Sequence, residues 1–376
     1  MKQTNNAIKF LMAQYRAIFK NANIAMVAAM AAAALASGQA QAAATESFNN
    51  TELGKLAAAT EIKVTGASAQ AGESKKLELT GGATDKSLAH TITISAGAAA
   101  NTIKGTAGSA DVNLSASSLK IAGASKDEAK LTIGDGKAAN ATNVQLKDIT
   151  ITKSGSLALT AKSDAQPGQG TTVTAETITI GGGETPGTDS SAVTLDKLTS
   201  LSGTTSLTIK EGAAVTVSGG ATLGGGAITV EDGSITLGTA SNTDTVGVLS
   251  TTGKLDIKGG EVSVAAGGSA KISGQTIDLT GTLTNAGTLS VSGLLTAKDQ
   301  STVANSESVT FDNGLAADSG STINNNTDDK TITLKGTSTF AEGATVSNSG
   351  DLVVEGTATF NSAAANITAG ADSRNM

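Results

Sequence analysis

The chain has 376 residues and a formal net charge of −7, with no cysteine, no tryptophan, one tyrosine and six phenylalanines. The lack of cysteine excludes disulfides, thiolate metal sites, thiol nucleophiles and a lipid-bearing cysteine. Aromatic rings normally supply much of the buried area of a wide core. Valine, isoleucine, leucine and alanine must therefore fill this core, which suits a narrow one packed in thin layers.

A secretory signal peptide is predicted over residues 1–42. Basic residues up to Lys20 precede the apolar run Ile24–Ala36, and small residues follow at Ala40 and Ala42. This order is typical of signal peptides, and the run is shorter than the about 20 residues that a membrane-spanning helix needs. We expect cleavage after Ala42, or alternatively after Ala40, and no transmembrane segment in the mature chain. A retained amphipathic helix is the other interpretation.

The charge is unevenly divided between this segment and the body. Residues 1–42 include four basic side chains and no acidic one, so the rest of the chain carries −11. The body has a single arginine, Arg374, and no aromatic clusters. Such a surface binds nucleic acid poorly, and we expect no nucleic-acid partner.

The body, residues 61–376, is predicted to be all-β. Short runs alternate apolar residues with threonine or serine, as in TITIS at Thr91, TITIG at Thr177 and TIDLT at Thr276. This period of two is typical of strands with one buried face. Residues 43–60 are expected to form a leader or an N-terminal cap, with Phe48 and the helix-like stretch Thr51–Thr60 as candidates for the cap.

A sharper repeat consists of an apolar residue, glycine at +4, residues facing one side at +6 and +8, and a small residue at +10. Asn285 and Asn348 stand two residues before the glycine in the last two copies. We interpret each copy as strand, turn and strand, in which glycine supplies a positive φ and asparagine bonds the turn. The five copies are unevenly spaced, so the coils are expected to vary in length; they begin at Ile151, Leu249, Val264, Leu283 and Val346.

Two architectures use such short strands. A β-sandwich joins them by hairpins, whereas a β-solenoid has a corner every seven or eight residues. Asn313-Gly314 is the only Asn-Gly pair of the hairpin type. The apolar series Ile257, Val264, Ile272 and Leu279 advances by seven, eight and seven positions. The sequence therefore favours an irregular solenoid with roughly 20–22 residues in each coil.

Motifs such as LTNAGTLSVSG from Leu283, behind an extended signal peptide, resemble the passenger regions of autotransporters and filamentous-haemagglutinin-type adhesins. They also resemble bacterial β-strand-repeat surface proteins. The likeness covers most of residues 60–370 and is one of repeat style. It implies a right-handed β-helix, a surface or extracellular location, and adhesion or matrix building. An autotransporter would continue into a membrane barrel, so this chain is a fragment, a short relative or a protein released by another route.

Residues for catalysis are scarce. His90 is the only histidine, so zinc sites made of histidine and cysteine are excluded and a Ser-His-Asp triad would need His90 itself. We interpret it as a plain surface residue at the start of a strand. Acidic pairs, which β-helix enzymes use to cleave polysaccharides, are interpreted as charged turns: Asp127–Glu128, Glu231–Asp232 and Asp328–Asp329.

Ion, phosphate and ice-binding motifs are also weak. IGDGKAAN from Ile133 and NNNTDDK from Asn324 offer oxygen ligands for calcium, but solvated turns are favoured. GGGETPG from Gly181 lacks the lysine and the helix of a phosphate loop. Thr-x-Thr pairs could order water, yet they have no fixed period, so a regular array is not expected; the pairs are Thr91/Thr93, Thr150/Thr152, Thr177/Thr179 and Thr331/Thr333.

The function expected from these observations is that of an exported structural or adhesive protein of the cell surface or extracellular matrix. No catalytic, metal or cofactor site is expected. The partners would be glycans, host or neighbouring-cell surfaces, or copies of the chain itself, bound through an extended repeat surface. The alternative is a β-helix polysaccharide-active enzyme of the lyase or depolymerase type.

Overall fold

The computed structural model describes residues 45–49, 61–65, 73–80, 89–95, 97, 101–104, 111–124, 129–134, 142–161, 170–183, 190–238, 246–325, 327–361 and 366–369. The chain divides into two units, Met1–Ala42 and Ala43–Met376, and every described residue belongs to the second. The predicted signal peptide and the helix-like stretch Thr51–Thr60 therefore lie outside the described residues.

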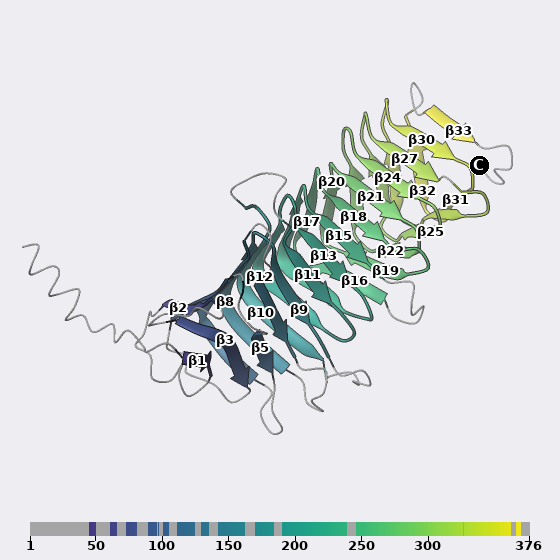
Figure 1. Ribbon diagram of the computed structural model, residues 1–376. Coiled ribbons are helices and arrows are strands. Elements are labelled where there is room, and N and C mark those ends of the chain that lie inside the picture. The colour runs from purple at the N-terminus through teal and green to yellow at the C-terminus, as the bar shows by residue number, and fades with distance from the viewer. Residues whose placement is uncertain are drawn as a thin grey trace, which may run out of the picture. The chain divides into compact units, whose positions relative to one another are not determined.

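The described residues are all-β, as predicted, and their strands stack side by side in parallel (Figure 1). No helix in the described ranges is long and apolar enough to cross a membrane. The pairings between these strands are all parallel, which excludes a hairpin-linked sandwich for this part of the chain. The prediction of a solenoid is confirmed, because from β3 onward strands that follow one another in the chain lie on different sides of a coil, and strands of adjacent coils pair in parallel.

In the N-terminal half of the described stack, long strands alternate with short ones from β5 onward. Each long strand runs around a corner, marked by a register shift in several pairings, and lines two sides of its coil. The strands are β1 (Thr45–Phe48), β2 (Glu61–Val64), β3 (Glu73–Thr80), β4 (Thr91–Ser95), β5 (Asn101–Lys104), β6 (Asp111–Ala122), β7 (Ala129–Ile133), β8 (Thr142–Thr152), β9 (Gly155–Leu159), β10 (Thr171–Ile180), β11 (Ala192–Leu195), β12 (Ser200–Ile209), β13 (Ala214–Val217), β14 (Thr222–Glu231) and β15 (Ser234–Leu237).

In the C-terminal half, three short strands form each coil. The change occurs at β14, whose first half pairs with β16 and whose second half pairs with β17. The strands are β16 (Val246–Thr251), β17 (Lys254–Lys258), β18 (Glu261–Val264), β19 (Ser269–Ser273), β20 (Thr276–Leu279), β21 (Thr282–Asn285), β22 (Thr288–Val291), β23 (Leu294–Ala297), β24 (Thr302–Asn305), β25 (Ser308–Phe311), β26 (Leu315–Ala317), β27 (Thr322–Asn325), β28 (Thr331–Leu334), β29 (Thr337–Phe340), β30 (Thr345–Asn348), β31 (Asp351–Val354), β32 (Thr357–Phe360) and β33 (Asn366–Ala369).

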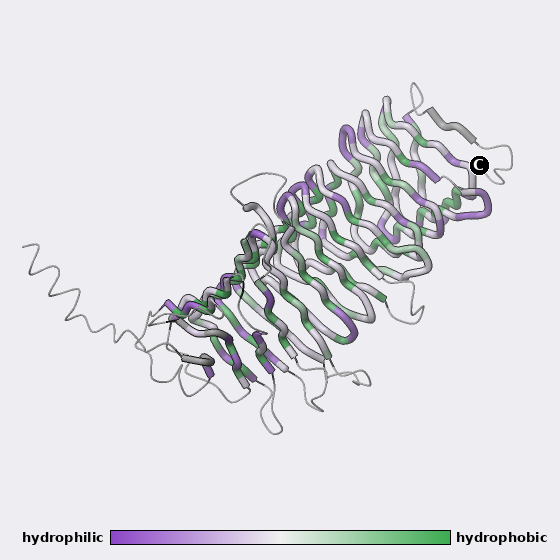
Figure 2. Tube along the Cα trace, in the orientation of Figure 1, coloured by the Kyte–Doolittle hydropathy of each residue, from purple (hydrophilic) through white to green (hydrophobic). Residues whose placement is uncertain are grey.

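The core consists of aliphatic side chains stacked in files, one residue from each coil. Hydrophobic and polar residues alternate along the strands (Figure 2), because successive side chains point to opposite faces. The predicted series from Ile257 to Leu279 is confirmed, since all four side chains are buried. One file, with every member at most 1% exposed, runs through Ile92, Leu119, Ile149, Ile178, Leu207, Ile228, Leu255, Ile277, Leu295 and Leu315.

The coils differ more in length than predicted. Leu119 and Ile149 are register partners in adjacent coils, and so are Ile277 and Leu295, although the second pair is much closer in the sequence than the first. The predicted coil length is therefore wrong for much of the chain. Backbone pairing fixes only the strands, so the segments between them are free to vary in length.

The five glycine repeats occupy three different corners of the coil, which explains their uneven spacing. They connect β8 to β9, β16 to β17, β18 to β19, β21 to β22 and β30 to β31. Their glycines at +4 have ordinary φ angles, so the predicted positive φ is wrong. A Cβ on any of them would lie within 3.0 Å of a backbone oxygen, in most cases one of the preceding coil. Glycine is required at these positions because the backbone of a neighbouring segment lies too close to leave room for a Cβ.

An asparagine ladder lies inside the C-terminal half. The Nδ2 of Asn285 donates to Oδ1 of Asn305, and the same bond joins Asn305 to Asn325 and Asn325 to Asn348, at 2.7 to 2.8 Å. All four side chains are at most 6% exposed. Oδ1 of Asn285 also accepts the backbone N–H of Gly287, the turn bond that the sequence predicted. Each buried side-chain amide is thus hydrogen-bonded to an asparagine of an adjacent coil.

Candidate interaction surface

Outward-facing side chains form a continuous polar face on sheet strands β4, β6, β8, β10, β12 and β14. Its side chains form two rows, or files, that run from coil to coil, and each coil contributes one residue to each file. Parallel register places Thr179 between Thr150 and Thr208, and Thr177 between Asp148 and Ser206. We call this surface the hydroxyl face, and it comprises Thr91, Thr93, Ser118, Lys120, Asp148, Thr150, Thr177, Thr179, Ser206, Thr208, Ala227 and Thr229.

The expectation that the Thr-x-Thr pairs form no regular array is confirmed on this face, because only two of its six coils carry threonine at both positions. The coils, although unequal in length, nevertheless return the outward residues of these strands to the same register. The pairs at Thr91 and Thr177 both belong to the hydroxyl face, together with Thr150. Thr331 and Thr333 lie elsewhere, on β28. In-register parallel pairing, and not sequence period, therefore determines what lines up.

Asp148 joins three coils of the hydroxyl face. Its Oδ1 accepts a hydrogen bond of 2.6 Å from Thr177 Oγ1, and its Oδ2 accepts one of 3.2 Å from Ser118 Oγ. The two hydroxyls come from the coils on either side of the carboxylate. These bonds restrict the rotamers of the three side chains that take part in them.

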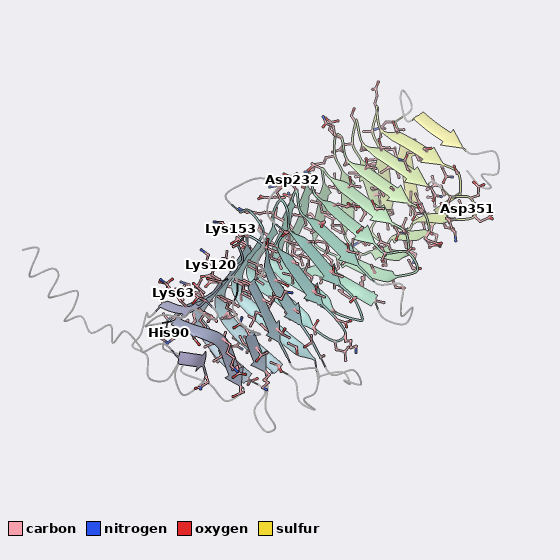
Figure 3. The ribbon with its side chains drawn as sticks, viewed as in Figure 1. Lys63, His90, Lys120, Lys153, Asp232 and Asp351 are labelled. Carbon is pink, nitrogen blue, oxygen red and sulfur yellow. The ribbon has the colours of Figure 1, made fainter. Side chains whose placement is uncertain are left out.

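One of the two files contains Thr93, Thr150, Thr179, Thr208 and Thr229, and its N-terminal end is basic. Lys63 on β2 pairs with Thr93, which pairs in turn with Lys120 (Figure 3). Further along, Thr229 pairs with Asp256 and Asp256 pairs with Asp278. The same file therefore changes from basic through hydroxyl to acidic character along the stack.

An ion cluster surrounds the acidic part of this file. Lys254 Nζ lies 3.0 Å from Asp256 Oδ2 and 2.8 Å from Asp278 Oδ2, and Lys298 Nζ lies 2.6 Å from Asp278 Oδ2. Burial raises the pKa of Asp278, but the hydrogen bonds from the two lysines outweigh it, so this pKa lies below its ordinary value of 3.8. The bonds to Asp278 and Asp256 raise the pKa of Lys254 above 10.5.

Replacing Asp278 with asparagine is expected to lower the free energy of unfolding at pH 7 by at most about 1 kcal/mol, because the lysines are largely solvated. The lowered pKa means that ionised Asp278 contributes stability above its unfolded-state pKa, and this contribution is lost as the pH falls through the folded-state value. Urea unfolding at pH 7 and at pH 2.5 measures the difference. A difference between the two proteins that is the same at both pH values would contradict this account.

His90 corrects another sequence-based interpretation. Its side chain is 4% exposed and faces inward at the start of β4, so it is not a surface residue. Within the described part of the chain, neither ring nitrogen has a hydrogen-bond partner. Its backbone N–H donates to Ser117 Oγ of the next coil, 3.1 Å away. The alternation of the strand places residue 90 inward, and no polar partner from the described residues meets the ring there.

The acidic pairs do not gather into a site. Glu231 ends β14, and Asp232 occupies the corner that follows with a φ of 57°. Asp329 is also a corner residue, with a φ of 61°. Asp127–Glu128 lies outside the described residues. Among the described residues, no group of three or more histidine, aspartate or glutamate side chains is placed to hold a metal ion.

The other weak motifs give no ligand site among the described residues. Gly134 of IGDGKAAN and Gly181 of GGGETPG have positive φ angles, and most of the remaining residues of both motifs lie outside the described ranges. In NNNTDDK, Asn325 is committed to the asparagine ladder, which the sequence analysis missed beyond Asn285 and Asn348. The missed signal is the pattern Thr-x-x-Asn at the ends of four strands, β21, β24, β27 and β30.

Comparison with known proteins gives no match: no family model, no curated protein and no solved structure is similar to the chain.

Proposed function

We propose that the chain is an exported structural or adhesive protein that binds through the hydroxyl face. In this proposal residues 1–42 direct export, Ala43 becomes the first residue, and the stacked coils form a right-handed β-helix at the cell surface or in the extracellular matrix. The N-terminal pattern of basic, apolar and small residues supports export. The repeat style supports a place among autotransporter-like and haemagglutinin-like surface proteins.

The hydroxyl face carries the proposal. It offers hydroxyl groups from six consecutive coils in one register, with Asp148 bonded to hydroxyls of both neighbouring coils. Each hydroxyl can donate and accept a hydrogen bond, so a chain of sugar hydroxyls is a suitable ligand. Contacts of this kind are weak singly, and their repetition along a surface raises the apparent affinity of a multivalent ligand.

The test compares two double variants in binding to an immobilised panel of glycans. Thr179→Glu with Thr208→Glu alters adjacent positions of the hydroxyl face, while Thr216→Glu with Thr236→Glu alters adjacent outward positions of β13 and β15. Beads coated with the first variant should adhere to the bound glycan at least about tenfold more weakly than wild type. Beads coated with the second should adhere like wild type.

The same experiment can reject the proposal. Equal loss of adhesion by both variants would reject the hydroxyl face as the binding surface. Release of reducing sugars from the panel by wild type would favour a polysaccharide-cleaving enzyme instead. Protein collected outside the producing cells should begin at Ala43, and an intact Met1 on that material would contradict the export step.

A further inference from the structure

A second polar face lies on a different side of the coils from the hydroxyl face. Strands β11, β13, β15, β18, β21, β24, β27 and β30 pair in parallel, each with the next, along the stack (Figure 1). Each strand has two outward side chains, and all of them are at least partly exposed. We call this surface the low-charge face, and it comprises Ala192, Thr194, Ala214, Thr216, Ser234, Thr236, Glu261, Ser263, Thr282, Thr284, Thr302, Ala304, Thr322, Asn324, Thr345 and Ser347.

Ionisable side chains are almost absent from the low-charge face. Glu261 is the only one at its sixteen positions, and the others are threonine, serine, alanine and a single asparagine. Residues 43–376 as a whole carry a net charge of −11, so two copies repel one another over most of their surface. Depletion of charge is typical of the centre of protein interfaces. The low-charge face is therefore the surface on which two acidic chains can approach with the least repulsion.

The dimensions of the low-charge face suit a second copy. Adjacent coils are about 4.8 Å apart, and a second copy has the same repeat, so the short side chains of each copy can lie between those of the other along the whole face. The eight strands have four residues each, which gives a face of roughly 38 by 13 Å. Two copies would therefore bury roughly 1,000 Å², the lower limit for a specific interface.

We propose that the low-charge face packs against the low-charge face of a second copy. A two-fold axis between the copies makes each contact occur twice. The hydroxyl face belongs to the other sheet of the coil and stays open in both copies. This inference deepens the proposed function and rests on it, since a pair of chains presents two hydroxyl faces to a multivalent ligand.

Glu261 weakens the proposed contact. It is exposed on β18, the fourth of the eight strands, so packing of the two faces removes water from its carboxylate without supplying a cation from the low-charge face. Glu261→Gln keeps the size of the side chain and removes its charge, and it should lower the dissociation constant of the dimer at least about threefold. A dissociation constant that is unchanged or raised by Glu261→Gln would place Glu261 outside the contact and overturn the proposal.

The double variants that test the proposed function also test this contact, with their parts exchanged. Thr216→Glu with Thr236→Glu adds charge to adjacent positions of the low-charge face and should raise the dissociation constant, measured by sedimentation, at least about tenfold. Thr179→Glu with Thr208→Glu adds the same charge to the hydroxyl face and should leave most of the dimer intact. Circular dichroism establishes that both variants fold. Monomeric wild-type protein at about 1 mM would overturn the proposal, as would equal weakening by the two variants.

Cysteine cross-linking locates the contact, because the chain has no cysteine of its own. Thr284→Cys lies near the middle of the low-charge face, where either direction of the second copy brings the two thiols close together, and a short bismaleimide should give a covalent dimer. Thr310→Cys, outward on β25 in the other sheet, should give none. Equal cross-linking of the two variants would overturn the proposal.

Failure of this inference can be told apart from failure of the proposed function. Coated beads present many copies whether or not the chains pair, so their adhesion to glycans reports on the hydroxyl face alone. Monomeric wild-type protein whose beads adhere would reject this inference alone. A dimer whose beads adhere to no glycan would reject the proposed function alone.

Discussion

Replacing Asn305 with alanine is expected to lower the stability of the C-terminal coils by about 3 kcal/mol. Asn305 is fully buried, accepts a hydrogen bond from Asn285 and donates to Asn325 Oδ1 and to the backbone oxygen of Glu307, at 2.7 to 2.8 Å. Alanine removes all three bonds and leaves Asn325 Oδ1 without its donor in the core, whereas Asn285 Nδ2 keeps only its bond of 3.0 Å to the backbone oxygen of Ser308. Loss of an established buried partner costs more than the average net value of a hydrogen bond.

Asn324→Ala is the matched control for this change. Asn324 precedes Asn325 on β27 and faces outward, so its loss should change the free energy of unfolding by less than about 0.5 kcal/mol. Urea unfolding gives the total effect. Because a stack of coils need not unfold as one unit, hydrogen exchange should also locate the loss in β21 to β30. Equal unfolding midpoints for the two variants would show that the ladder adds no stability.

Gly314→Ala is expected to destabilise the protein by about 3 kcal/mol or more. Gly314 lies between β25 and β26 with a φ of +93°, a conformation that an L side chain adopts only at a cost. A Cβ at this position would also overlap the backbone of Thr337, the first residue of β29. The substitution should therefore force the two neighbouring coils apart, and thermal unfolding followed by circular dichroism measures the effect.

Gly267→Ala separates the two causes. Its φ is +68°, but no heavy atom lies within 4 Å of the added Cβ. This variant should lose only the conformational part, about 1 to 2 kcal/mol. Equal losses at the two glycines would mean that the close approach of the coils at Gly314 has no energetic weight.

The period-two pattern was enough to predict the strands and their inward residues. Leu289 and Val291, at +6 and +8 of the LTNAGTLSVSG motif, are buried as predicted. Val354, at the corresponding place in the last copy, is exposed because no described coil covers it. Local alternation thus predicts which way a side chain points, but its burial depends on the next coil.

The parts that could not be predicted depend on stacking between coils. Asn313-Gly314 has the sequence of a hairpin turn, yet the flanking strands pair with other coils and the pair forms a corner. Asn305 and Asn325 lack the glycine that drew attention to Asn285, so their role became visible only once the four strand ends lay in register. The hydroxyl face escaped prediction for the same reason, because its residues are unevenly spaced along the chain.

The unequal coil lengths have an evolutionary consequence. Residues added between two strands would lengthen one coil without moving the strands that precede or follow it, because backbone pairing fixes only the strands. A mutation that adds or removes one residue within a strand would instead turn its inward side chains outward. Changes of length between strands would therefore leave the outward threonines in register, whereas changes of length within a strand would not.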